Sequence, residues 1–448
     1  MPPAIADTEP RFLFVTVGVP RSGGSGGQIV SWRLLSSYAQ LGVVDVLALT
    51  RPDAHASPEL EGAAERFELV PVAQINYVHA RARNAALFGG ALLRREPFRV
   101  AKFRSRAAVR CLGRWLGETR YDAIHCDYLS TAPYRDLVPD TPAILAEHNV
   151  EWQQFSLLAE QQRNPLTRAA LRADSRRTRA WEARALERFD HTLVLSEHDE
   201  ELLRRARPDL ASRISVWRVP VDEIPAPRRR TGPPTFVVLG SLRSVGRVHG
   251  LRWFLREVWE PVRGDIADAR LEIIGADPPA DIRGWDGREG VRVHGFVEDL
   301  EPFLDAAYGC AIPLFAGGGI RVKLLKLIGR GIPCVGTPVA MQGMTTLEGC
   351  VVAWEPQEWI SVLCRLAERP DDLWDEARLG ARRLQVEHSP RLALDHLETV
   401  LAGIGAASAD GNSATPRAAR LPAPPSPARS PAAPGSPSRR GSSAPDHG

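Results

Sequence analysis

Short apolar runs alternate along this chain with segments whose apolar residues recur at helical spacing. Phe12–Val17 is an apolar run that ends in a glycine-rich loop, and a helical pattern then passes through Trp32, Leu35 and Tyr38. A second apolar run covers Val43–Leu49. This order of strand, loop, helix and strand is the repeating unit of a parallel α/β sheet. The start of the chain is therefore predicted to form such a sheet.

The same alternation continues to about residue 400, with one interruption. Further strands are predicted at residues 123–125, 143–146, 192–195, 236–239, 271–274, 291–294, 310–314 and 334–335. Helices are predicted at 165–189, 250–258 and 320–328. Residues 223–234 (EIPAPRRRTGPP) break the pattern with Pro, Arg and Gly, which is typical of a linker. We therefore predict an α/β fold of two Rossmann-like domains, 1–222 and 235–404, that face a cleft at the carboxyl ends of their strands.

Composition and charge add few constraints on function. The 448 residues suit two domains, and a formal net charge of +3 indicates no particular partner, so no nucleic acid is expected. The chain contains no apolar run of the roughly 20 residues that span a bilayer, and its first residues do not resemble a secretory signal. A cytoplasmic protein is expected. Residues 405–448, rich in Pro, Ala, Ser and Arg, are predicted to be a disordered tail. The six cysteines are far apart in sequence and are expected to be scattered buried thiols.

The most informative segment lies between Cys310 and Met344. A predicted buried strand leads into Gly317, Gly318 and Gly319, and Arg321 and Lys323 follow at the start of a predicted helix. Glycines allow the backbone to approach a ligand closely, and the first turn of a helix offers unpaired N–H groups and the positive end of its dipole. Such a place suits a phosphate or diphosphate. The alternative is a glycine-rich turn with two solvated cations.

Two features of the N-terminal half also fall at predicted strand ends. The loop Pro20–Gly27 contains Gly24 and lacks the G-x-G-x-x-G spacing, so it does not indicate a dinucleotide site. It is either a ligand-binding loop or only a flexible turn. His148 follows the run 143–146, where it could bind a sugar hydroxyl or orient an acceptor hydroxyl, or could be a structural histidine.

At these motifs the sequence resembles the group 1, family 4 retaining glycosyltransferases of the GT-B fold. The segment around GGGIRVK and GIPCVGTP carries the resemblance most clearly, supported by GSLRSVGRVHG, LEIIGADP, VRVHGFVEDL, AEHNVEWQQF and WEARALERFDHTLVLSEHD. The resemblance covers roughly residues 10 to 400, and the order and spacing of these motifs are more specific than any one of them.

The resemblance implies that residues 1–222 bind the acceptor and residues 235–404 bind a nucleoside-diphosphate sugar. It implies transfer of the sugar, with retained configuration, to a lipid-linked, polysaccharide or small-molecule acceptor. We expect His148, Arg321 and Lys323 to be catalytic, since negative charge grows on the departing diphosphate. We expect the donor to contact a further set of residues: Gly317, Gly318, Gly319, Lys326, Gly24 and Gly240. No metal or cofactor is expected, because the chain contains no Asp-x-Asp.

The sequence departs from the family pattern on the donor side. Lys326 stands where the family carries a Glu that accepts hydrogen bonds from the nucleotide ribose, and an ammonium can only donate. A catalytically impaired, nucleotide-sugar-binding or scaffold relative is therefore an alternative. Another enzyme on the same fold, such as a sugar-nucleotide epimerase, is a third hypothesis.

A basic segment lies in the N-terminal half. Between Arg81 and Arg120, basic residues outnumber acidic ones eleven to two, and apolar residues such as Leu87, Phe98 and Phe103 are interleaved. Peripheral contact with an anionic membrane is one interpretation. A solvated arginine-rich helix is the other.

Overall fold

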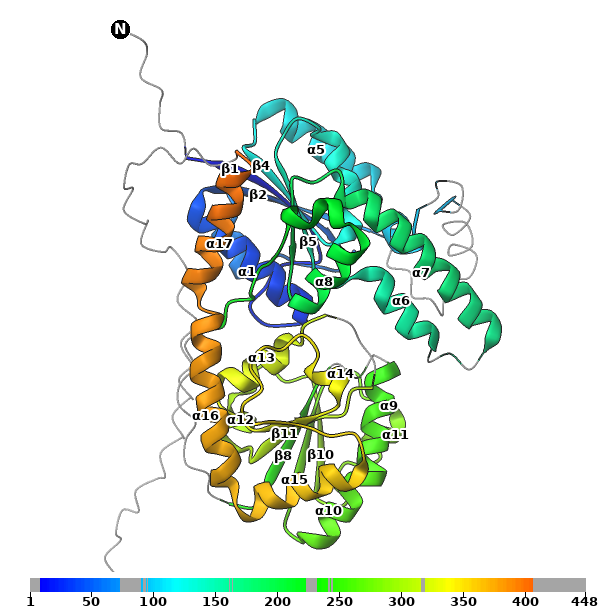
Figure 1. Cartoon of the computed structure of the whole chain (residues 1–448), viewed down its shortest axis with the longest axis vertical. Helices are drawn as coiled ribbons and strands as arrows, with labels where there is room; N and C mark the ends of the chain where they lie inside the picture. Colours follow the sequence, from blue (N-terminus) through cyan, green and yellow to red (C-terminus); the bar gives the residue numbers. More distant parts are fainter. Residues whose placement is uncertain are drawn as a thin grey trace, which may run out of the picture.

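The computed structural model describes residues 9–72, 90–91, 94, 96–160, 162, 164–222, 232–240, 242, 245–315 and 319–405. Two α/β domains lie one above the other in Figure 1, each built on its own sheet. All strand pairs in both sheets are parallel. The predicted pair of Rossmann-like domains is confirmed.

The N-terminal sheet has the strand order β3-β2-β1-β4-β5-β6-β7. Its strands are β1 (Arg11–Val17), β2 (Val43–Thr50), β3 (Arg66–Pro71), β4 (Ala123–Asp127), β5 (Ala143–Glu147), β6 (His191–Val194) and β7 (Ile214–Val216). Every residue of β4 and β5 is buried, as expected for central strands of a parallel sheet that is covered on both faces.

Helices cover this sheet and are bounded by clear local signals. They are α1 (Gly26–Leu41), α2 (Pro58–Ala63), α4 (Phe98–Lys102), α5 (Arg106–Glu118), the 3-10 turn η1 (Leu129–Leu137), α6 (Glu151–Glu160), α7 (Pro165–Leu186), α8 (Glu197–Ala206) and the 3-10 turn η2 (Pro208–Arg213). Ser25 and Gln28 form a capping box that begins α1 directly after the glycine-rich loop. This cap fixes where the loop ends and the helix starts.

The C-terminal sheet has the order β10-β9-β8-β11-β12-β13. Its strands are β8 (Thr235–Leu239), β9 (Arg270–Ile274), β10 (Val291–Gly295), β11 (Gly309–Ile312), β12 (Cys334–Gly336) and β13 (Cys350–Val352). The covering elements are α9 (Val245–Trp253), the π-helical turn η3 (Phe254–Trp259), α10 (Glu260–Asp265), α11 (Ala280–Arg283), α12 (Glu301–Ala306), α13 (Val322–Gly329), α14 (Pro338–Met341) and α15 (Pro356–Glu368).

The last two helices cross from the lower domain to the upper one. Helix α16 (Pro370–Glu387) runs along the C-terminal domain, and α17 (Pro390–Gly403) continues beside the N-terminal domain, on the left of Figure 1. The indole of Trp217 donates to the carbonyl of Ala393 (3.1 Å), and Ser215 contacts His396 (2.8 Å). The chain therefore crosses between the domains twice.

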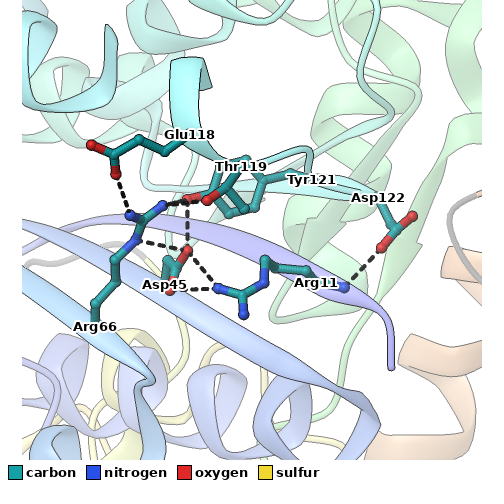
Figure 2. A network of polar contacts seen from close by, with 7 residues as sticks. All are labelled: Arg11, Asp45, Arg66, Glu118, Thr119, Tyr121 and Asp122. Atoms are coloured by element: carbon teal, nitrogen blue, oxygen red, sulfur yellow. Dashed lines mark hydrogen bonds and ion pairs between the residues drawn. The ribbon is translucent and has the colours of Figure 1, made fainter. Parts of the chain in front are cut away.

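A buried polar network closes the N-terminal sheet at the amino ends of its strands. Asp45 is fully buried and accepts a hydrogen bond from Tyr121 Oη (2.7 Å). Its carboxylate also pairs with Arg66 (2.9 Å) and Arg11 (3.3 Å), as Figure 2 shows. All these partners come from this domain, so the network joins β1, β2 and β3 to the turn before β4. It lies at the opposite end of the strands from the predicted ligand site.

The structure differs from the sequence-based predictions in several places. The helix predicted at 250–258 is part of a continuous helical run from Val245 to Asp265 that contains the π-helical turn. Strands β3, β7 and β13 were not predicted, because each is short or only partly buried. Most of the predicted linker and the tail from residue 406 lie outside the described residues.

The cysteines are not all scattered. All six are free thiols, but Cys310, Cys334 and Cys350 lie side by side in register on β11, β12 and β13. Parallel in-register partners point to the same face of a sheet, so strand pairing brings together residues that lie far apart in sequence.

Candidate functional site

Residues from both domains meet where the carboxyl ends of the two sheets face each other. In the N-terminal sheet the strand order reverses between β1 and β4, and in the C-terminal sheet between β8 and β11. Ligands of open parallel sheets bind at such reversal points. The predicted residues Gly24, His148, Gly240 and Gly319 all follow strands at or next to these points.

Gly319 lies in close contact with the N-terminal domain. Its φ is +70°, and a Cβ atom at this position would lie 2.0 Å from Asn149 Oδ1 and 2.7 Å from the carbonyl oxygen of His148. Gly343 similarly approaches Ser196, where a Cβ would lie 3.2 Å from the serine Cβ. The backbone after β11 is therefore held against the strand end that carries His148. Gly317 and Gly318 lie outside the described residues.

The N-terminus of α13 lies at this junction and has no side-chain cap. Arg321 occupies the N-cap position, makes no capping hydrogen bond there, and the first turn contains no acidic residue. Its guanidinium donates to the carbonyl of Gly319 (2.9 Å) and that of Val339 (3.4 Å). Burial, reinforced by the nearby Arg247, lowers the pKa of Arg321 to about 10. The helix start therefore combines the positive end of a helix dipole with local positive charge, as an anion site does.

Two further cations converge on the same place. Burial, together with Arg247 and Lys326, lowers the pKa of Lys323. Burial also lowers the pKa of Arg247, which lies on α9 after the turn at Gly240. A Cβ on Gly240 would lie 2.5 Å from Arg247 Nη1, so a larger residue there would displace this guanidinium from its present position. Among the residues described, neither Lys323 nor Arg247 has a carboxylate in ion-pair contact. Repulsion between neighbouring cations favours binding of an anion between them.

Lys326 has a carboxylate partner of its own. Its ammonium lies 3.1 Å from Glu301 of α12, and Arg330 pairs with both Glu301 and Asp305. Burial lowers the pKa of Lys326. The side chain thus joins α13 to α12, and its charge is partly neutralised, unlike that of Lys323.

His148 is held by a buried carboxylate that the sequence analysis did not single out. His148 is 5% exposed, and its Nε2 lies 2.6 Å from Oδ1 of Asp127, the last residue of β4. The other carboxylate oxygen accepts hydrogen bonds from Thr16 Oγ1 (2.6 Å) and Ser31 Oγ (2.5 Å). Despite burial, the nearby His148 and His125 imidazoles lower the pKa of Asp127 below its usual range. Asp127 is therefore ionised at neutral pH.

A strained tyrosine and a glycine complete the surroundings of this imidazole. The Tyr128 ring stacks on the His148 ring, with centroids 3.8 Å apart. Tyr128 has a φ of +78°, which is rare for a residue with a side chain. A Cβ on Gly27 would lie 2.3 Å from the Tyr128 hydroxyl and 3.8 Å from His148 Nδ1. Strain of this kind is frequent at functional sites.

The remaining predicted loop residue, Gly24, is exposed at the edge of the junction. Its φ is +135°, and a Cβ there would lie 3.0 Å from Gln28 Oε1 of the capping box. Gly26, two residues further on, lies close to Val322 of α13. The loop after β1 and the start of α13 are thus neighbours.

In the described part of the basic segment, some side chains form internal contacts, whereas Arg106, Arg110, Arg114 and Arg120 are exposed. Phe98 and Phe103 are buried, and Arg94, Arg99 and Arg104 pair with Glu96 or Glu151. The expected exposed apolar face is therefore absent at these two phenylalanines; Leu87 lies outside the described residues. In the part of the chain that is described, no helix combines the length and the apolar character needed to span a membrane.

Two functional candidates were missed from sequence for different reasons. Asp127 stands two residues beyond the predicted strand 123–125, although a carboxylate at the end of a buried strand is a usable signal. Arg247 is one of several arginines in its segment, and only the contact with Gly240 distinguishes it.

Comparison with known families agrees with this geometry. Residues 24–223 match the family model described as Glycosyltransferase Family 4, and residues 233–369 match the one described as Glycosyl transferases group 1. No curated protein sequence matches the chain.

Several solved structures share the fold at low sequence identity. WaaG, a glycosyltransferase involved in lipopolysaccharide biosynthesis, is 16% identical with a TM-score of 0.58 over 86% of this chain and 99% of its own. HepE of Anabaena in complex with UDP is 12% identical, with a TM-score of 0.57 over 88% of this chain and 100% of its own. The lipopolysaccharide outer core galactosyltransferase WaaB, in its apo form, is 15% identical, with a TM-score of 0.53 over 88% and 99%. The N-terminal domain therefore matches a Glycosyltransferase Family 4 model and the C-terminal domain a Glycosyl transferases group 1 model, and the two-domain GT-B fold is shared with these solved glycosyltransferases.

Proposed function

We propose that the protein transfers a sugar from a nucleoside-diphosphate sugar to an acceptor hydroxyl, with retention of configuration. In this proposal the diphosphate binds at the start of α13, between Arg247, Arg321 and Lys323. Gly240 lets Arg247 approach this place, and Gly319 brings the loop after β11 to the strand end that carries His148. Gly317 and Gly318, outside the described residues, are proposed to contact the donor as well. The acceptor enters from the N-terminal side, past Gly24 and His148.

One observation carries the proposal. The N-terminus of α13 has no cap and no acidic residue in its first turn, and cations from two elements converge on it. Burying several cations together is unfavourable unless an anion joins them. A diphosphate supplies that charge and accepts both side-chain and backbone N–H bonds.

The same groups suit the charge change of the reaction. As the bond between the anomeric carbon and the phosphate oxygen breaks, negative charge grows on the diphosphate. Arg321 and Lys323 then stabilise the transition state more than the bound donor. Arg321 offers a fork of donors, whereas Lys323 acts as a point charge. His148 faces the junction from the other domain and is proposed to bind a hydroxyl of the sugar or of the acceptor.

The choice of substrates to test follows from the structural neighbours. HepE binds UDP and UDP-glucose in its complexes, and WaaG and WaaB are named for lipopolysaccharide synthesis. We therefore propose a uridine diphosphate sugar as the first donor to test, and a polysaccharide or glycolipid as the acceptor class. Retention is part of the proposal and is tested by the anomeric configuration of the product.

Donor binding by charge variants tests the proposal directly. Thermal stabilisation by UDP, GDP, ADP and CMP, and by their sugars, identifies the base, since a ligand at 100 times its Kd stabilises by about 2.7 kcal/mol. Lys323→Ala and Arg247→Ala are each expected to weaken diphosphate binding about 10- to 100-fold, as charge-assisted hydrogen bonds are lost. Arg256→Ala, an exposed arginine on the same helical run as Arg247, is the matched control. Equal affinity in all three variants contradicts the proposed diphosphate site.

A catalytically impaired relative is a second candidate, favoured by Lys326. This residue binds Glu301 and offers no acceptor to a ribose. The two candidates are separated by measuring donor hydrolysis in parallel with donor binding. Binding without hydrolysis or transfer across the tested donors supports the impaired relative, whereas release of free sugar supports the enzyme.

A further inference from the structure

Asp127 has no role in the mechanism above, yet it has the most elaborate buried environment near the site. Its carboxylate is 0% exposed and accepts hydrogen bonds from three groups that belong to three elements: β1, α1 and the end of β5. A buried, ionised carboxylate is unfavourable unless every lone pair finds a donor. A polar residue that only completed the structure at the end of β4 would not need to be charged, so the charge of Asp127 calls for another role.

The ionised state of Asp127 determines where the proton of His148 lies. A carboxylate only accepts hydrogen bonds, so His148 Nε2, at 2.6 Å, must carry the hydrogen. In the neutral imidazole, Nδ1 is then an acceptor. This atom is buried and has no hydrogen-bond partner among the described residues.

The unpaired Nδ1 lies on the side of the imidazole toward Gly27, where α1 begins after the glycine-rich loop. It lies near the first turn of α1 at Gly27, next to Val322 of α13, which contacts Gly26. Gly319 packs on the carbonyl side of the same histidine. The Tyr128 ring covers one face of the imidazole and prevents it from turning away. A buried acceptor without a partner, held in this way, is suited to receive a hydrogen bond from a bound molecule.

We propose that Asp127 is a positioning residue that fixes the Nε2–H tautomer of His148, so that Nδ1 accepts a hydrogen bond from a hydroxyl of the bound sugar or acceptor. This inference rests on the proposed function for the identity of the ligand, but the tautomer itself is a property of the free protein. Thr16 and Ser31 serve the same arrangement because they hold the second carboxylate oxygen.

Asp127→Asn reverses the hydrogen-bond direction with almost no change of shape. The Thr16 and Ser31 hydroxyls, which donate to Oδ2, favour the amide oxygen on their side. The amide NH₂ then faces His148 Nε2, which becomes the acceptor, and the imidazole proton moves to Nδ1. A donor then faces the substrate hydroxyl where an acceptor is needed.

The test combines kinetics with ¹⁵N NMR of the full-length protein. The His148 ring nitrogens are assigned among the 11 histidines by the signals that His148→Ala removes. In the wild type, Nδ1 is expected to show the unprotonated shift and Nε2 the protonated one. In Asp127→Asn the two are expected to exchange, with a fall in kcat/KM of about 10- to 100-fold.

Asp45→Asn is the matched control. Asp45 is equally buried in the same sheet, on β2, which β1 separates from β4, and it lies at the amino ends of the strands (Figure 2). It is expected to lose stability while keeping kcat/KM and the His148 spectrum. The inference is overturned if wild-type Nδ1 carries the proton, or if folded Asp127→Asn keeps wild-type kcat/KM. The wild-type spectrum decides the tautomer even if Asp127→Asn does not fold. If the wild type shows the expected tautomer but neither binds nucleotides nor transfers sugar, the proposed function is contradicted. The positioning of His148 by Asp127 is then still supported.

Discussion

Replacing Gly319 by alanine tests whether the contact between the domains is needed for catalysis. The new Cβ atom would lie 2.0 Å from Asn149 Oδ1 and 2.7 Å from the His148 carbonyl oxygen. The amide side chain can rotate away, but the carbonyl belongs to the backbone of a strand end and cannot. The two domains must therefore separate, or the loop after β11 must shift.

Two energetic effects of this substitution have to be separated. Alanine at a φ of +70° costs roughly 1–2 kcal/mol by itself, because the Cβ crowds its own backbone. The clash with His148 adds to this cost only when the domains are in contact. Gly287→Ala is the control for the first effect, since Gly287 has a φ of +78° and no atom within 4 Å of the added Cβ.

The two variants are compared by thermal unfolding and by steady-state sugar transfer. Both are expected to lose a similar, small amount of stability. Gly319→Ala is also expected to lower kcat/KM about 10- to 100-fold, the loss that follows from about 1.4–2.8 kcal/mol of weakened closure. Equal kcat/KM in the two variants would refute the reasoning, because it would show that His148 and the loop after β11 need not meet.

Three further substitutions test other parts of the structure. Burial raises the pKa of Glu182 to about 8, and burial and Glu182 together raise that of Glu147, so both carboxyls are protonated in the folded protein at mildly acidic pH. The stability that these two protonated carboxyls contribute is complete below pH 4.5, near their pKa in the unfolded chain, and is lost as pH rises through 8. The midpoint of thermal unfolding should therefore fall over this range. Glu182→Gln should flatten the dependence of this midpoint on pH. Asp45→Asn breaks the pairing of a buried carboxylate with two partly exposed arginines and is expected to cost about 1–3 kcal/mol, measured by urea unfolding; no measurable loss would contradict this. Lys326→Glu should keep or raise nucleotide affinity if a ribose acceptor is missing there, but it places a second carboxylate beside Glu301 and should lower the unfolding midpoint; a weaker affinity at unchanged stability would show that the ammonium itself binds the donor.

The sequence was sufficient to predict the fold because parallel α/β sheets have a strong one-dimensional pattern. Strands β1 and β5 are largely buried and therefore appear as mainly apolar runs. Edge strands such as β3 and β13 have exposed positions, so their pattern is weak. The start of α13 was predicted two residues early because Arg321 caps the helix rather than lying within it.

The candidate site was only half predictable, because its other half depends on contacts between distant segments. The glycines and cations around residue 320 form one local motif. Asp127, by contrast, acquires its importance from Thr16 and Ser31, about a hundred residues earlier in the chain. The surroundings of Cys334 likewise depend on residues that are distant in sequence, because strand pairing determines its neighbours on β11 and β13.

The double crossing of the chain between the domains has a practical consequence. Because Trp217 is fully buried and donates its indole N–H to Ala393 of α17, the N-terminal half is completed by residues from the far end of the sequence. A fragment ending near residue 222 would lose that cover and expose an indole together with the adjoining side of α1. Dissection of this enzyme into separately expressed halves should therefore graft the 389–405 helix onto the first half, and the two polypeptides should be soluble only with that exchange.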